Sequence, residues 1–186
     1  MLDRNQIEKA AGKAGEVAYS ILGLECGYSI RLIDDRNNPL DAQLDTSKLE
    51  IQINLSKLEP FPPEIAGTED EDYRHHLKIC YLVFHEMRHI YQIQAVNVYT
   101  INEQLGSHML QPLESDKKAA LWLKEMKDSS IPPESSDTEA DANAFAYYLT
   151  NRYPIPLKMA QTNQRIGVMK RKYNKIPIPE IYENRI

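Results

Sequence analysis

Cysteine is scarce in this chain. Only Cys26 and Cys80 occur among its 186 residues, and each lies in an apolar stretch. Small domains that are held together by disulfides carry several cysteines at regular spacing, so a disulfide framework is excluded. We expect both residues to be buried free thiols, in a protein that folds in a reducing cytoplasm.

Long apolar runs are also missing. No segment approaches the roughly 18 consecutive apolar residues that a membrane-spanning helix requires. The N-terminal stretch MLDRNQIEKA is charged and polar. We therefore expect neither a membrane anchor nor a secretory signal.

Positive charge is not in excess. The chain has 22 Lys and Arg against 27 Asp and Glu, which gives a net charge of -5. Proteins that bind nucleic acid present clustered Lys and Arg to the phosphates, so nucleic acid is not expected as the main partner. The one basic run, KRKYNK at 170–175, is interpreted as the solvated end of a helix.

The apolar pattern predicts an α+β fold with a small sheet and several helices, in a single domain over 1–186. The segment 59–72 (EPFPPEIAGTEDED) is expected to be a loop, because prolines oppose both helices and central strands. The segment 95–136 is the least regular and is predicted to be an insertion with one short helix, capped by Ser115. In chain order the predicted elements are a helix at 5–22, strands at 28–35 and 48–58, and helices at 72–94, 116–128, 138–151 and 156–173.

The motif HEMRH, residues 85–89, interrupts the apolar helix predicted at 72–94. Two histidines at i and i+4 lie on one helix face and can both reach one zinc ion, Zn2+, at about 2.0–2.1 Å. Glu86 then lies beside a zinc-bound water and can act as its general base. The alternative is that His85 and His89 bind no metal and form hydrogen bonds to the backbone or to a glutamate. Arg88 faces away from this site and is expected to pair with an acid.

A catalytic zinc ion needs a third protein ligand from another element. Glu139 is favoured because it begins a helix whose small residues, Ala142 and Ala146, would allow a close approach; Asn143 could then hydrogen-bond a ligand. Two capping boxes are possible at the start of this helix. In the box of Ser136 and Glu139 the Glu139 side chain would bond the backbone of Ser136, whereas the box of Thr138 and Asp141 would leave Glu139 available as a ligand. The candidates considered are Glu103, His108, Glu114, Glu125, Asp137, Glu139 and Asp141.

The motif at 85–89, followed by EADANAFA at 139–146, resembles the ImmA/IrrE family of zinc metallopeptidases. The family carries HExxH and a later helix of the form E-x-x-A-N-x-F-A. The resemblance implies a zincin-like fold, His85, His89 and Glu139 as metal ligands, and Glu86 as the catalytic base.

These observations predict a zinc metallopeptidase that acts on a protein or peptide substrate. The alternatives are a non-catalytic regulator that keeps the zinc site for stability or binding, and a zinc hydrolase of a non-peptide substrate. Strand 48–55 would either form a sheet edge that pairs with the substrate backbone or be a fully paired inner strand. His75 and His76, about 15 Å along the helix from His85, are expected to be surface or cap residues. Candidate donors to the oxyanion are Arg88, Tyr91, His108, Tyr147 and Tyr148.

Overall fold

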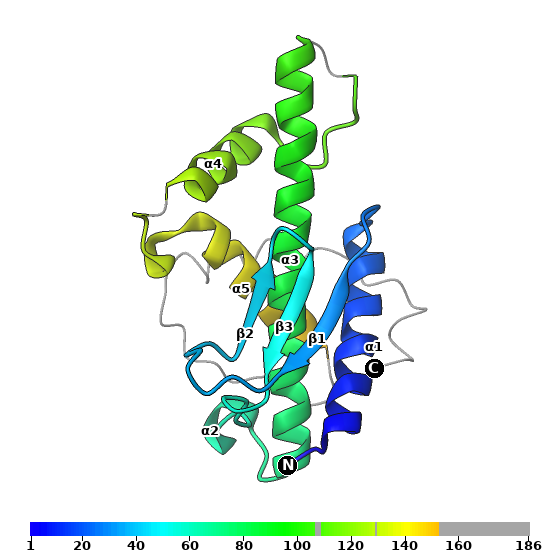
Figure 1. Ribbon diagram of the computed structural model, residues 1–186, viewed down its shortest axis with the longest axis vertical. Helices are drawn as coiled ribbons and strands as arrows, with labels where there is room; N and C mark the ends of the chain where they lie inside the picture. Colours follow the sequence, from blue (N-terminus) through cyan, green and yellow to red (C-terminus); the bar gives the residue numbers. More distant parts are fainter. Residues whose placement is uncertain (107–108, 129, 153–186) are drawn as a thin grey trace.

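The computed structural model describes residues 1–106, 109–128 and 130–152, and within them the predicted α+β architecture is confirmed. A small sheet and helix α1 lie against a long central helix, α3, while α4 and α5 lie on its other side (Figure 1). The predicted helix at 156–173 lies outside the described residues. In chain order the elements are α1 (Arg4–Leu22), β1 (Ser29–Ile33), β2 (Ala42–Asp45), β3 (Glu50–Asn54), α2 (Pro63–Ala66), α3 (Glu71–Leu105), α4 (Asp116–Lys127), the 3-10 turn η1 (Pro133–Ser135) and α5 (Asp137–Thr150).

Helix α3 is the axis of the molecule and is longer than predicted. It spans 35 residues from the cap Asp70, whose carboxylate accepts from the N–H of Tyr73, to Gly106, which ends it at a φ of 61°. Its middle turns are buried on nearly every side, as the apolar run predicts, with Ile79, Val83 and Phe84 fully inaccessible. The prediction stopped at residue 94, yet the helix continues for three more turns toward α4.

The sheet has the strand order β1-β3-β2, with β1 parallel and β2 antiparallel to β3. The strand predicted at 48–58 is therefore the central one, so the alternative of a fully paired inner strand is confirmed and that of a substrate-binding edge is wrong. Among the described residues the two edges are formed by β1 and by β2, a four-residue strand that was not predicted. Ile51 and Ile53 of β3 are fully buried, so their face of the sheet packs into the main core.

Two predictions near the start of α3 are wrong. The proline-rich segment contains the short helix α2, because Pro63 occupies the first helical turn, where a missing N–H costs nothing. His75 is not a surface residue: it is 2% exposed, and its Nδ1 accepts a hydrogen bond of 3.0 Å from the N–H of Leu2. His76 is half-buried.

The segment 95–136 packs against the domain through its own small core. Trp122 of α4 is fully buried against Ala95 and Val96 of α3. Helix α4 begins after Ser115, although the Ser115 side chain makes no capping bond. Because α4 also packs on α5, the described part of this segment is fixed to the body of the protein.

Asn54, at the end of β3, anchors the chain that leads into β2. Its side chain is 1% exposed, and its Nδ2 donates to the carbonyl oxygens of Asp35 and Leu40 at 2.8 and 3.3 Å. We predict that Asn54→Ala lowers the free energy of unfolding by about 1–3 kcal/mol, because buried carbonyls lose their donor. Urea denaturation measures the loss. Asn97→Ala, at an exposed position of α3, is the control, and an equal effect of the two changes would contradict this role for Asn54.

Both cysteines are free, as predicted. Cys80 is buried, whereas Cys26 is partly accessible, so its predicted burial is wrong. Within the described residues, none of the helices combines the length and apolarity needed to cross a bilayer.

Candidate metal centre

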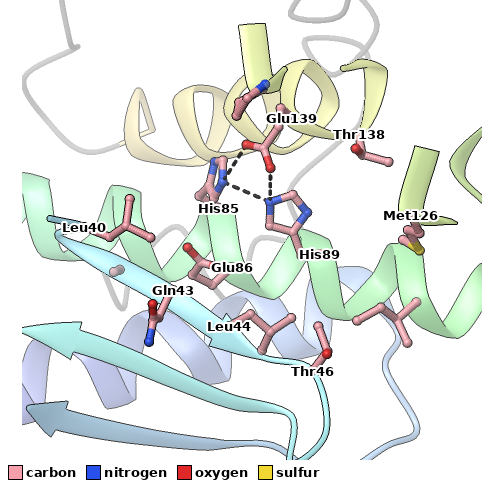
Figure 2. A pocket seen from close by; sticks show the side chains of 13 residues that line it. Leu40, Gln43, Leu44, Thr46, His85, Glu86, His89, Met126, Thr138 and Glu139 are labelled. Carbon is pink, nitrogen blue, oxygen red and sulfur yellow. Dashed lines mark hydrogen bonds and ion pairs between the residues drawn. The ribbon is translucent and has the colours of Figure 1, made fainter. Parts of the chain in front are cut away.

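Helix α3 presents His85 and His89 one turn apart on the same face, as the motif predicts. Their rings meet edge to face with centroids 4.7 Å apart, and the two Nε2 atoms are 3.0 Å apart. The two side chains are 15% and 17% exposed. Figure 2 shows both rings directed toward α5.

Helix α5 brings Glu139 to the same point. One carboxylate oxygen lies 3.4 Å from Nε2 of His85 and the other lies 3.3 Å from Nε2 of His89 (Figure 2). Ala142 and Ala146, which follow Glu139 on α5, are fully buried, in agreement with the predicted close approach of the two helices. One ligand atom from each of His85, His89 and Glu139 lies within 4.8 Å of the other two.

The other candidates for the third ligand have different partners or positions. Glu114 and Asp141 form ion pairs with Arg88 and Lys118, and Glu125 caps α5. Glu103 is exposed near the end of α3, and Asp137 lies in the first turn of α5 outside the cluster. His108 lies outside the described residues.

The charges of the cluster are strongly coupled. Burial alone would raise the pKa of Glu139, but the contacts with His85 and His89 hold it well below its usual range. Burial alone would likewise lower the pKa of His89, and the contact with Glu139 raises it. Burial raises the pKa of Glu86, and the negative charge of Glu139 adds to the rise, against the opposing effect of the histidines. Two carboxylates thus face the imidazoles, an arrangement that attracts positive charge.

A cavity of about 690 Å³ opens beside the cluster. Glu86 lines it together with His85, His89 and Glu139, and Figure 2 shows Glu86 on the side of α3 that faces β2. The edge strand β2 forms one wall, and the turn η1 and the end of α4 form another. The remaining lining residues are mainly apolar: Leu40, Ala42, Gln43, Leu44, Thr46, Ile93, Met126, Pro133 and Thr138.

The side chains predicted as oxyanion donors do not line this cavity within the described part of the chain. The hydroxyl of Tyr91 donates to the carbonyl of Leu113, and Tyr147 and Tyr148 belong to the main core. Arg88 is buried in an ion-pair cluster, as described below.

Asn143 makes a different contact from the one predicted. Its Oδ1 accepts a 2.7 Å hydrogen bond from the hydroxyl of Tyr81, which precedes His85 by one turn of α3. Asn143 follows Glu139 by one turn of α5, so this pair lies close to the cluster. Burial raises the pKa of Tyr81, and the negative charge of Glu139 adds to the rise. The spacing of four residues before His85 is a sequence signal that would have identified Tyr81.

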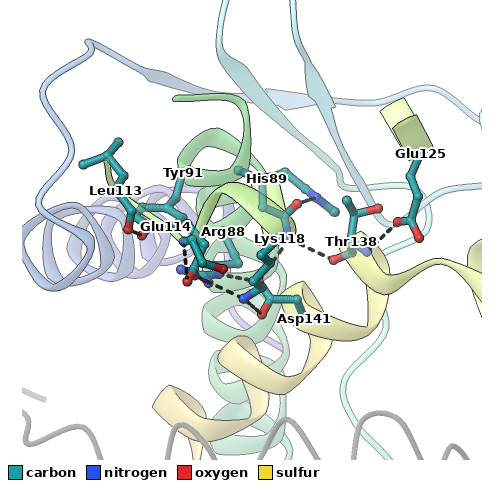
Figure 3. Close-up of polar contacts among 11 residues, drawn as sticks. Arg88, His89, Tyr91, Leu113, Glu114, Lys118, Glu125, Thr138 and Asp141 are labelled. Carbon is teal, nitrogen blue, oxygen red and sulfur yellow. Dashed lines mark hydrogen bonds and ion pairs between the residues drawn. The ribbon is translucent and has the colours of Figure 1, made fainter. Parts of the chain in front are cut away.

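Arg88 pairs with acids, which confirms its prediction. Its Nε donates to Asp141 at 2.7 Å, and its guanidinium lies 3.9 Å from Glu114 and stacks 4.3 Å from the ring of Tyr91. Lys118 of α4 donates to the other oxygen of Asp141 at 3.0 Å. Figure 3 shows Arg88, Lys118, Glu114 and Asp141 converging between α3, α4 and α5. We call these four residues the ion-pair cluster.

The N-terminus of α5, which carries Glu139, is capped from another helix. Ser136 is the N-cap, and its hydroxyl accepts from the N–H of Glu139 at 3.3 Å, as the first of the two predicted boxes requires. The Glu139 carboxylate does not accept from the N–H of Ser136, which donates to the carbonyl oxygen of Pro133, and Glu125 of α4 caps the next two N–H groups. The carboxylate of Glu125 accepts from the N–H groups of Asp137 and Thr138 at 3.0 and 2.9 Å. Glu139 is therefore free to turn toward the histidines.

We predict that Glu125→Ala lowers the free energy of unfolding by about 1–2 kcal/mol near neutral pH, because N–H groups in the first turn of α5 lose their acceptor. Burial alone would raise the pKa of Glu125, but the N–H groups of Asp137 and Thr138 lower it. A carboxylate whose pKa is lower in the folded protein than in the unfolded chain stabilises the fold. This stabilisation is present above the pKa of the unfolded chain, about 4.3, and is lost as the pH falls through the pKa of the folded protein.

The difference between wild type and Glu125→Ala should therefore shrink in acid, which urea denaturation at a series of pH values measures. Glu16→Ala, at an exposed position of α1, is the control and should show little difference at any pH. A difference between wild type and Glu125→Ala that stays constant from neutral to acid pH would contradict the capping role of the ionised carboxylate.

Comparisons of this chain with protein-family models, curated proteins and solved structures gave no match. The chemistry of the centre must therefore be inferred from its own residues. They are two imidazoles and a carboxylate that converge on one point, next to a second carboxylate, at the wall of an open cavity.

Proposed function

We propose that this chain is a zinc-dependent metallopeptidase with a zincin-like fold. His85, His89 and Glu139 would hold the metal, and Glu86 would act as the general base. The observation that carries the proposal is the convergence of three ligand atoms from two helices at the wall of a cavity that Glu86 also lines.

The distances within the cluster suit a tetrahedral ion. Ligands at about 2.0–2.1 Å from a tetrahedral zinc are separated from one another by about 3.3 Å. The three separations here are 3.0, 3.3 and 3.4 Å. Two histidines and a glutamate are also a ligand set of catalytic zinc sites, in which a fourth position stays open. These residues therefore fit the metal without rearrangement of the helices.

Zinc in such a site activates water and polarises a carbonyl group as a Lewis acid. The chain itself has to move the protons. The carboxylate of Glu86 lies in the cavity beside the ligands without belonging to them, so it can accept a proton from the attacking water. The same group can then deliver that proton to the amine that leaves.

The walls of the cavity favour a peptide as the substrate. Strand β2 pairs with β3 on one side, and within the described residues its other edge has no strand partner. An extended peptide can add to such an edge through backbone hydrogen bonds, which orients it past the metal ligands. Leu40, Leu44 and Met126 would then contact its apolar side chains.

One observation favours the alternative of a non-catalytic, zinc-stabilised binding protein. Among the described residues, no tyrosine or arginine lines the cavity to stabilise an oxyanion. Gln43, Thr46 and Thr138 are the uncharged hydrogen-bonding side chains that line it. Both functions require the metal, and they differ in whether bound peptide is cleaved.

The test of the metal is elemental analysis of the untagged protein, before and after reconstitution with zinc. We expect about one zinc ion per chain. Glu139→Ala should weaken zinc binding by at least about 100-fold, more than the loss of an outer-shell contact would. Asp137→Ala, which removes an acid from the same turn of α5, is the control. Protein that holds no zinc after reconstitution would refute both functions, and unchanged affinity in Glu139→Ala would refute the third ligand.

A further inference from the structure

We propose that Gln92 is a positioning residue for His89: it fixes the imidazole with its proton on Nδ1 and leaves Nε2 as the bare nitrogen at the metal centre. Gln92 lies on α3, three residues after His89, and its side chain is 0% exposed. The assignment of the proton follows from hydrogen bonding alone. The consequence for zinc affinity rests on the proposed function.

The orientation of the Gln92 amide is determined by two acceptors. Its Nε2 lies 3.0 Å from the carbonyl oxygen of Thr138 and 3.1 Å from Oδ2 of Asp141. A flipped amide would bring its oxygen against both of these oxygens, and acceptors held at that distance in a buried site repel one another without a hydrogen between them. The nitrogen therefore faces α5, and the oxygen faces His89.

The amide oxygen in turn determines where the proton of His89 lies. Oε1 of Gln92 is 2.8 Å from Nδ1 of His89. An amide oxygen can only accept, so Nδ1 must carry the hydrogen, and a neutral imidazole has only one. Its Nε2 is then bare, at 3.0 Å from Nε2 of His85 and 3.3 Å from Glu139. This is the nitrogen that a metal would need.

The ion-pair cluster holds Gln92 in place from the other side. Asp141, which accepts from Gln92, also accepts from Arg88 at 2.7 Å and from Lys118 at 3.0 Å (Figure 3). A chain of contacts thus runs from α4 through Asp141 and Gln92 to His89. The sequence predicted only that Arg88 pairs with an acid. The chain of contacts also gives Arg88 a role in the metal centre, because Arg88 holds Asp141, and Asp141 orients the amide of Gln92.

His85 provides an internal comparison. Among the described residues its buried Nδ1 has no hydrogen-bond partner, so no contact from outside the site orients this ring. The two histidines of one motif thus differ: His89 is fixed from outside the site, whereas His85 is not. We expect a change at Gln92 to alter the proton position of His89 directly, and that of His85 only through the 3.0 Å contact between the two Nε2 atoms.

The test compares Gln92→Leu with Gln94→Leu, a matched change two residues along α3, where Gln94 contacts Glu25 and Cys26 outside the site. Nitrogen-15 NMR of metal-free protein, at a pH where the imidazoles are neutral, reports which nitrogen carries each proton. In wild type and Gln94→Leu we expect His89 to be protonated on Nδ1. In Gln92→Leu we expect His89 to be a mixture of the form protonated on Nδ1 and the form protonated on Nε2. Zinc affinity, measured by competition with a chelator, should fall about 10- to 100-fold in Gln92→Leu alone.

Wild-type His89 protonated on Nε2 would overturn the proposal, and this measurement decides the case if Gln92→Leu fails to fold. Folded Gln92→Leu with the affinity of Gln94→Leu would overturn it as well. If wild type shows the Nδ1 proton but binds no zinc, the proposed function fails, while the assignment of the His89 proton to Gln92 stands.

Discussion

Glu86→Gln is expected to bind zinc as tightly as the wild-type protein and to cleave peptides about 10²- to 10⁴-fold more slowly. Glutamine has the size and shape of glutamate, so the packing around this buried side chain is kept. Its amide cannot accept a proton from water, and Glu86 is not among the three converging ligands, so the metal should stay. Zinc content and the cleavage rate of a peptide library, both measured on the same preparation, test the two parts separately.

Glu103→Gln is the matched control, because Glu103 lies on the same helix at an exposed position far from the cavity. It should match wild type in both assays. Loss of zinc from Glu86→Gln would make Glu86 a ligand and contradict the geometry. Cleavage by Glu86→Gln at the wild-type rate would remove Glu86 as the base. Zinc-loaded wild type that cleaves no peptide in the library would favour the non-catalytic alternative.

The parts of this fold that could be predicted are those in which neighbours in sequence carry the signal. Helix α1 and strands β1 and β3 have a regular apolar period, because each turns one face toward the core, and the first half of α3 is an apolar run that the core surrounds. The two histidines and Glu86 were predicted for the same reason: their relative placement depends only on the turn of one helix. Glu139 was chosen among seven candidates through the small residues that follow it on α5.

The elements that were missed depend on contacts with distant parts of the chain. Strand β2 is four residues long and half-buried throughout, so it shows no alternation and is held by pairing with β3. The last turns of α3 also contain Val98, Tyr99, Ile101 and Leu105, but Ala95 and Val96 are the buried apolar residues there. Their support comes from Trp122 on α4. Helix α2 depends on a proline at its first turn, where the usual rule against proline does not apply.

The residues around the candidate ligands were missed for the same reason. Glu125 had been considered as a ligand, yet it caps α5 from α4, and nothing in its own neighbourhood indicates this. Gln92 and Tyr81 follow and precede the motif on α3, but their partners, Asp141 and Asn143, lie on α5. A motif in the sequence can thus indicate which atoms would bind a metal, whereas the contacts that orient those atoms require the three-dimensional structure.

The largest loss of stability is expected from Asp141→Ala, which should lower the free energy of unfolding by about 3–5 kcal/mol. Asp141 is fully buried and accepts from Arg88, Lys118 and Gln92. Arg88 is only 4% exposed, so its charge cannot be solvated once this partner is gone. Glu114 is a weaker substitute at 3.9 Å. Urea denaturation of the metal-free protein measures the loss without a contribution from zinc binding.

The double variant Arg88→Met/Asp141→Leu separates the cost of an unpaired charge from the cost of lost packing. It removes both buried charges and keeps apolar side chains against Tyr91 and Trp122, while Lys118 retains Glu114 at 3.2 Å. A buried pair replaced by apolar groups often costs little, so the double variant should be more stable than Asp141→Ala. Two outcomes would mean that the charge of Arg88 is not what makes Asp141 necessary. One is a double variant that loses as much stability as Asp141→Ala, and the other is a loss below about 1 kcal/mol in Asp141→Ala itself.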